Sequence, residues 1–199
     1  MRVVFFGTPE PAADALDTLL ASSHEVVAVV TQPDRPRGRS GTPQPSPAKQ
    51  RALDAGIPVI QPASPRDDGF AATLASYAPD VCGVVAYGHI LPPEVLAVPS
   101  KGTVNVHFSL LPAYRGAAPV QRAIMAGETE TGVTTFLLEP TLDTGPVLRQ
   151  VTEPIEPTDS TGTLLTRLAS IGARLLVETL DALEAGTASA VPQDPARAL

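Results

Sequence analysis

Short apolar runs alternate with helix-like segments along most of the chain, and this alternation limits the fold more than any other feature. The run at 26–30 is apolar almost throughout, as is typical of a parallel strand covered on both faces. Thr8 suits the N-cap of the first helix, and Pro9 suits its first position. The alternation predicts an α/β fold with a Rossmann-like, doubly wound and mostly parallel sheet.

The expected elements follow from the periodicity of apolar residues. Strands are expected at 2–7, 24–31, 57–61, 80–87, 102–109, 132–138 and 147–154. Helices are expected after Thr8, near 47–55, 67–77 and 118–126, and at 160–185, with loops at 32–46 and 88–100. Gly186 suits the end of the last helix, and 187–199 has no periodicity. We therefore expect one domain at 1–186 followed by a linker or tail at 187–199.

Composition narrows the class of protein. A chain of 199 residues with 43% hydrophobic and 18% charged residues is expected to fold as one domain. No apolar run approaches the ~18 residues of a membrane span and no signal-peptide pattern is present, so a cytoplasmic protein without membrane contact is expected. Cys82 is the only cysteine, which excludes an internal disulfide and argues against a metal site. The net charge of −7 leaves room only for a local basic patch.

The run 103–109 carries polar side chains where a buried strand normally has apolar ones. A strand period of two places Asn105, His107 and Ser109 on one face. These side chains are either a satisfied polar network in the core or a site for acyl transfer. In the second case the Asn105 amide would stabilise an oxyanion, and the His107 imidazole would handle a proton near neutral pH.

Asp143 is a third candidate, in a loop that directly follows a predicted strand. A carboxylate near His107 would orient the imidazole and favour its charged form, although Asp143 taken alone is better explained as an ordinary turn residue. Other chemistries lack their motifs, since the sequence has no nucleophile elbow, metalloprotease motif or P-loop. The segment Gly7-Thr8-Pro9 lacks the three spaced glycines of a dinucleotide site, but the helix start there could receive an anionic group.

Three further residues are assigned from their local context. His24 precedes a strand and is expected in a surface turn, whereas Cys82 lies within an apolar strand and is expected in the core. His89 follows a strand at its carboxyl end, where ligands of open parallel sheets bind.

The loop after the second strand is locally basic. Arg35, Arg37, Arg39 and Lys49 stand there against Asp34. The loop is either a solvated surface segment or a phosphate contact, and its position at the carboxyl ends of the strands favours phosphate contact.

Taken together, these motifs resemble the formyltransferases that use 10-formyltetrahydrofolate. The resemblance rests on Asn105-x-His107, on the run 109–119 that begins Ser109-Leu110-Leu111-Pro112, and on Leu142-Asp143-Thr144-Gly145. The segments 6–10, 31–36, 45–47 and 85–88 are similar to the branch of this family that acts on methionyl-tRNA. The resemblance extends over about residues 1–190.

The resemblance implies a reaction and a set of site residues. The reaction would transfer a formyl group from 10-formyltetrahydrofolate to the α-amino group of methionyl-tRNA, without a metal, and the enzyme is expected to be a monomer. The implied catalytic residues are Asn105, His107 and Asp143. The implied folate-binding residues are Tyr87, Gly88, His89, Ile90, Leu91, Leu138, Leu142 and Gly145. The implied substrate-binding residues are Gly7, Thr8, Pro9, Arg35, Arg37, Arg39, Ser109, Leu110, Leu111 and Pro112, with the 35–39 loop contacting the initiator tRNA.

Two departures from the family bear on these expectations. Thr141 stands where much of the family has glycine, which affects the expected path of the folate loop. The C-terminal β-barrel domain of the family is absent from these 199 residues. The chain is therefore expected to be either a catalytic domain or a free-standing formyltransferase for a small amine, such as an amino sugar or a carrier-bound amino acid. A catalytically silent folate- or RNA-binding module is the alternative from another class.

Overall fold

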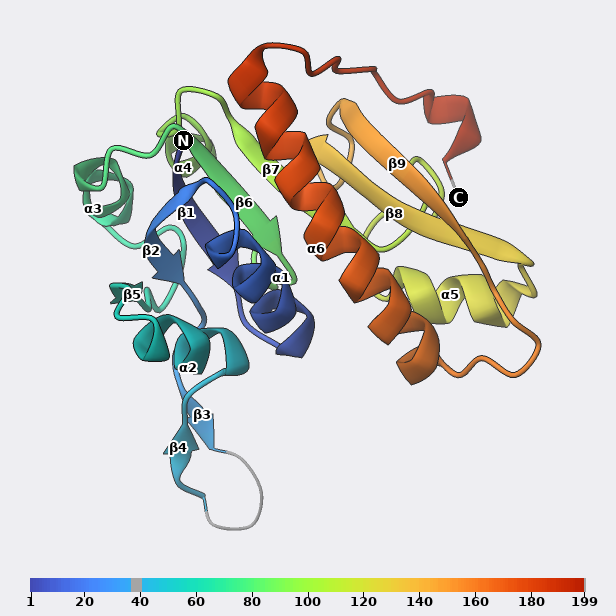
Figure 1. Cartoon of the computed structure of the whole chain (residues 1–199), viewed down its shortest axis with the longest axis horizontal. Coiled ribbons are helices and arrows are strands. Elements are labelled where there is room, and N and C mark those ends of the chain that lie inside the picture. Colours follow the sequence, from blue (N-terminus) through green and yellow to red (C-terminus); the bar gives the residue numbers. More distant parts are fainter. Residues whose placement is uncertain (37–40, 199) are drawn as a thin grey trace.

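One twisted sheet of seven strands runs through the molecule, in the order β5-β2-β1-β6-β7-β8-β9 (Figure 1). The structure is a computed structural model that describes residues 1–36 and 41–198. Five strands are parallel: β1 (Arg2–Gly7), β2 (Glu25–Val30), β5 (Val59–Ile60), β6 (Val81–Val85) and β7 (Thr103–His107). The remaining two, β8 (Glu130–Leu137) and β9 (Val147–Pro154), run antiparallel to their neighbours. The predicted α/β fold with a mostly parallel sheet is confirmed.

Helices cover both faces of the sheet, as the apolar runs predict. The helices are α1 (Glu10–Leu20), α2 (Pro47–Asp54), α3 (Phe70–Ser76), α4 (Pro93–Leu96), α5 (Pro119–Ala126) and α6 (Thr161–Ala185). Alternate residues of β1 enter opposite cores, because successive side chains of a strand point to opposite faces. Val3 and Phe5 pack with α1 and α6, whereas Val4 and Phe6 pack with α3 and α4.

The long loops contain short elements that were not expected. A small hairpin of β3 (Arg35–Pro36) and β4 (Pro43–Gln44) lies in the expected 32–46 loop, and α4 lies in the expected 88–100 loop. The N-cap of α1 is Pro9, without a side-chain cap, so the assignment of Thr8 to this position is wrong by one residue. Instead, the Thr8 hydroxyl accepts a hydrogen bond from the backbone amide of Gln32 at 3.4 Å.

The end of the chain, expected to be a linker or tail, has hydrogen bonds to the domain. The segment 187–198, here called the tail, lies beside the end of the sheet in Figure 1. Val191 and Val147 exchange two backbone hydrogen bonds of 2.8 Å each, and Pro195–Arg197 forms a 3-10 turn. The tail is therefore connected to the domain by hydrogen bonds, although most of its residues are exposed.

Buried polar and sulfur groups give one correction and one confirmation. His24 is buried, with Nε2 3.0 Å from the Asp181 carboxylate, so its expected place in a surface turn is wrong. Cys82 is in the core as expected, and burial raises the pKa of its thiol to about 12. Within residues 1–36 and 41–198, no helix combines the length and apolarity needed to cross a membrane.

Candidate active site

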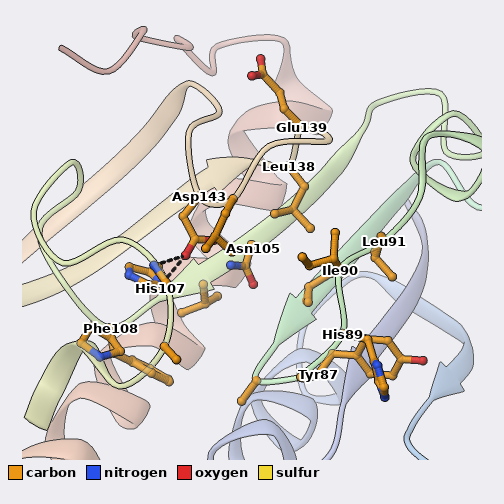
Figure 2. A pocket seen from close by; sticks show the side chains of 18 of the residues that line it. Tyr87, His89, Ile90, Leu91, Asn105, His107, Phe108, Leu138, Glu139 and Asp143 are labelled. Atoms are coloured by element: carbon orange, nitrogen blue, oxygen red, sulfur yellow. Dashed lines mark hydrogen bonds and ion pairs between the residues drawn. The ribbon is translucent and has the colours of Figure 1, made fainter. Parts of the chain in front are cut away.

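A cavity of about 420 Å³ opens at the carboxyl ends of β6 and β7 (Figure 2). Its walls come from the Tyr87–Leu91 loop, from β7, from residues 116–119 and from the loop that follows β8. This is the edge of an open parallel sheet at which ligands bind, and the volume falls within the usual range for small-molecule sites. The cavity is therefore the natural candidate for the functional site.

Strand β7 brings its polar residues to the cavity through its two-residue period. Val104 and Val106 belong to the core on the α6 side of the sheet. Asn105 is half-buried and His107 is buried, and both line the cavity. Figure 2 shows Asn105, His107 and Asp143 gathered at one side of it, so three of the sequence-predicted residues are brought together.

One hydrogen bond of the His107 ring determines which ring nitrogen carries the proton. Nε2 lies 2.9 Å from the carbonyl oxygen of Tyr114, which can only accept, so Nε2 carries the proton and donates it. Nδ1 lies 3.7 Å from Oδ2 of Asp143. In the neutral ring, Nδ1 has a free electron pair. The ring can therefore accept one proton at Nδ1, and the adjacent carboxylate then stabilises the imidazolium.

Asp143 is held in a conformation that few residues adopt. It is buried, its φ is 51°, and its Oδ2 accepts a 2.8 Å hydrogen bond from the amide of Gly116. Ala86 and Ala118, which also line the cavity, have φ values of 47° and 57°. Left-handed backbone at non-glycine residues costs free energy and persists where the surroundings impose it, often at functional sites. Aspartate tolerates this region better than most residues.

The residues predicted to bind folate mostly line the same cavity. Tyr87, Gly88, His89, Ile90, Leu91, Leu138 and Leu142 all contribute to its walls. Ile90 and Leu142 are 58% and 56% exposed, an unusual degree for large apolar side chains beside a cavity. Burial first, and then the charge of Asp67, raises the pKa of Tyr87 to about 12, so this phenol stays neutral. Gly145 is outside the cavity lining, where a side chain would collide with the Leu137 carbonyl.

The residues predicted to bind the second substrate are more dispersed. Ser109 is buried and its hydroxyl donates to the Ala113 carbonyl at 2.6 Å, as expected of a satisfied core residue. Among the described residues that line the cavity, none comes from the predicted run Ser109, Leu110, Leu111 and Pro112. Gly7 is buried at the end of β1.

Thr8 and Arg35 line a second, smaller cavity of about 130 Å³. Next to it, Lys49 donates to Asp34 at 2.6 Å and to Gln61 at 2.8 Å, and the Lys49 hydrogen bond is the main cause that lowers the pKa of Asp34. Lys49 is therefore engaged within the protein. Arg37 and Arg39 lie outside the residues that the structure describes.

Backbone groups of the 114–118 turn are the part of the site that sequence reasoning missed. The Tyr114 carbonyl binds His107, and the Gly116 amide binds Asp143. Every residue has a backbone carbonyl, so the residue type does not reveal which backbone groups bind the site. The turn does lie within the sequence motif 109–119. Gln193 in the tail was also missed, and it has hydrogen bonds to the Asp143 loop.

Comparison with known proteins assigns the chain to a family. The formyl transferase family model matches residues 1–180, and the chain belongs to this family. The chain is 58% identical over 194 residues to methionyl-tRNA formyltransferase of Streptomyces griseus and of Mycobacterium avium. These matches cover 97% of this chain but 63% and 61% of the relatives, so the chain spans about three fifths of their length.

Solved structures with a similar fold include other formyltransferases. Phosphoribosylglycinamide formyltransferase from Bacillus halodurans is 25% identical with a TM-score of 0.77, over 92% of this chain and 95% of that chain. The N-formyltransferase from Helicobacter canadensis, solved with folinic acid and dTDP-3-aminofucose, is 21% identical with a TM-score of 0.71. That match covers 97% of this chain and 67% of the other, and it speaks to the fold alone.

Proposed function

We propose that the chain transfers a formyl group from 10-formyltetrahydrofolate to the α-amino group of methionyl-tRNA, with Asn105, His107 and Asp143 as its catalytic residues. The observation that carries this proposal is the buried His107–Asp143 pair, 3.7 Å apart, on the wall of the cavity that Asn105 also lines. Relatives named methionyl-tRNA formyltransferase support the choice of amine.

The proposed reaction needs no nucleophile from the protein. The neutral amine attacks the formyl carbon, a new C–N bond forms, and the bond from that carbon to N10 of the folate breaks. Asn105 donates a hydrogen bond to the oxygen that becomes negative in the tetrahedral intermediate. His107 takes the amine proton at Nδ1, Asp143 stabilises the resulting imidazolium, and the proton passes to the departing N10.

The apolar part of the cavity is suited to the folate. Ile90, Leu91 and Leu142 offer apolar surface for a flat heteroaromatic ring. We further propose that Arg35, with Arg37 and Arg39, contacts phosphates of the tRNA. Arg35 lines the second cavity together with Thr8, which follows the carboxyl end of β1. Because β1 is parallel to β6 and β7, this cavity is at the same edge of the sheet as the larger one.

The test compares methionyl-tRNA with a free amino sugar as formyl acceptors at several salt concentrations. The proposal expects transfer to methionyl-tRNA that weakens as salt rises, because contacts between cationic side chains and phosphates release counterions. The amino sugar is the matched small-amine control. Faster, salt-independent transfer to the amino sugar would contradict the proposed acceptor and leave only the formyl transfer chemistry.

A further inference from the structure

A side chain from the tail joins the two loops that hold Asp143. The Gln193 amide nitrogen donates to the carbonyl oxygens of Asp143 at 2.9 Å and Gly145 at 2.8 Å. Its amide oxygen accepts from Nε of Arg115 at 3.0 Å and from Nη2 at 2.8 Å. A glutamine side chain has two donor hydrogens and two acceptor lone pairs, so Gln193 uses its full capacity here.

These contacts lie on both sides of the hydrogen bond that fixes the catalytic carboxylate. Asp143 Oδ2 accepts from the amide of Gly116, and Arg115 is the residue immediately before Gly116. Gln193 therefore holds the backbone of the carboxylate on one side and the neighbour of its hydrogen-bond donor on the other. Because the left-handed φ of Asp143 is imposed by its surroundings, contacts of this kind are what keep the conformation populated.

The tail is anchored independently of this side chain. Val191, two residues before Gln193, forms the two backbone hydrogen bonds with Val147 on β9, and these bonds do not involve the Gln193 side chain. The Asp194 side chain accepts from the amide of Ala196 at 3.0 Å within the tail itself. A substitution of Gln193 therefore removes the connection between the loops while the tail stays in place. This separation makes the role of the side chain testable.

We propose that Gln193 is a positioning residue for formyl transfer, which keeps Asp143 beside His107 by joining the Asp143 loop to the Arg115 turn. The proposal rests on the function proposed above for the catalytic residues. Gln193 lies beyond residues 1–180 that match the family model. On this proposal the active site extends into the tail, a segment that the sequence alone predicts to be a linker or tail.

The first experiment measures amide hydrogen exchange, which does not depend on activity. In Gln193→Ala, exchange of the Gly116 amide is expected to rise by at least ~10-fold, because the Asp143 loop and the Arg115 turn lose the hydrogen bonds that hold this amide on Asp143. Amides of β6 should be unchanged, which distinguishes local release from general destabilisation. Asp194→Ala is the matched control and should leave the Gly116 amide as in the parent. An unchanged Gly116 amide in Gln193→Ala overturns the proposal.

The second experiment measures kcat and KM for transfer to methionyl-tRNA. Gln193→Ala is expected to lower kcat by ~10- to 100-fold, the cost of a misplaced catalytic group, with a smaller change in KM. Gln193→Glu keeps an acceptor for Arg115 but loses both donations to the loop carbonyls, so it should lose kcat to a similar extent. Parent-like kcat in either variant overturns the positioning role. If the parent itself transfers no formyl group to methionyl-tRNA, the proposed function fails, and hydrogen exchange alone then decides whether Gln193 holds the loops.

Discussion

The state of His107 is decided by one backbone carbonyl. Because Nε2 is committed to Tyr114, a proton from substrate can enter the ring only at Nδ1, which faces Asp143. The carboxylate is thus placed at the atom where positive charge would appear. A rotated ring would break the Nε2 hydrogen bond, so the same contact that selects the tautomer also fixes the orientation.

Removing the side chain of Asn105 or of His107 should reduce formyl transfer sharply. We expect Asn105→Ala and His107→Ala each to lower the rate by at least ~100-fold, the lower range for loss of an oxyanion donor or a proton-transfer group. Steady-state kinetics, with circular dichroism as the check on folding, measure this. Gln121→Ala, an exposed amide on α5, is the matched control. Near-parental activity in either site variant would show that the site is assigned incorrectly.

Asp143→Asn should separate binding from turnover. The asparagine oxygen can still accept from the Gly116 amide, so the loop and the folate affinity should be largely retained. Turnover should be abolished, because a neutral amide cannot stabilise the imidazolium of His107. Titration with folate measures whether binding is retained, and single-turnover kinetics measure whether turnover is lost. A variant with the rate and pH profile of the parent would remove Asp143 from the mechanism.

At the level of secondary-structure elements, the site depends on how closely α6 approaches β7. Gly172 lies against the strand, and a Cβ there would come within 2.8 Å of Val106 Cγ1 and 3.2 Å of Phe108. Val106 lies between Asn105 and His107 in sequence, so a shift of the strand would displace both of these candidate site residues. The helix thus determines the site from the opposite face of the sheet.

Gly172→Ala should therefore destabilise the protein despite the higher helix propensity of alanine. Overpacking typically costs about 1–3 kcal/mol, which exceeds the gain of up to about 1 kcal/mol from replacing glycine in a helix. Urea denaturation measures the change in the free energy of unfolding. Gly162→Ala on the same helix is the control, since a Cβ there meets only Ser160 Oγ at an ordinary 3.7 Å. Equal stability of Gly172→Ala and the parent would mean that Val106 and Phe108 can move away from the added Cβ at no cost in free energy.

The start of α6 should give the protein a specific sensitivity to acid. Arg167 donates from both Nη atoms to Asp159 at 2.7 Å, and this pairing holds the pKa of Asp159 well below its usual range. A carboxyl whose pKa is lowered on folding stabilises the protein above its ordinary pKa of about 4 and loses this effect as pH falls. The urea midpoint difference between the parent and Arg167→Met should thus be smaller at pH 3 than at pH 7. A difference that does not change with pH would contradict this account.

Local patterns were sufficient for the sheet and for β7, because strand alternation and buried apolar runs depend on neighbouring residues. They did not predict α4, because its four residues are too few to show a helical period. The burial of His24 depends on Asp181, far away in sequence on α6, and no local pattern reports such a contact. The same holds for Gln193, whose partners are two backbone carbonyls and a distant arginine.

At the scale of the whole molecule, charge is distributed unevenly. A chain with a net charge of −7 carries three arginines within five residues of sequence at 35–39, and the first of them, Arg35, lines the small cavity together with Thr8. An acidic surface repels nucleic acid, so binding would be confined to the part of the surface where cations are concentrated. Affinity for tRNA should accordingly depend on this loop.

Replacing Arg35, Arg37 and Arg39 together with alanine should weaken tRNA binding and flatten its salt dependence. Each lost phosphate contact lowers the slope of log affinity against log salt by about 1, so a change of up to about 3 is expected. Folate affinity should be unchanged. Filter binding at several salt concentrations measures the slope, with Arg174→Ala, an exposed arginine on α6, as the control. A slope equal to that of the parent would exclude the loop from the tRNA interface.

The burial of Cys82 has a consequence for the conditions under which this chemistry can run. The thiolate is the form of cysteine that oxidants attack, and a pKa of about 12 keeps this thiol protonated in any cell. The chain has no other cysteine, and an amide, an imidazole and a carboxylate withstand the mild oxidants that modify thiolates. The candidate site residues Asn105, His107 and Asp143 should therefore keep their chemical form in the presence of peroxide.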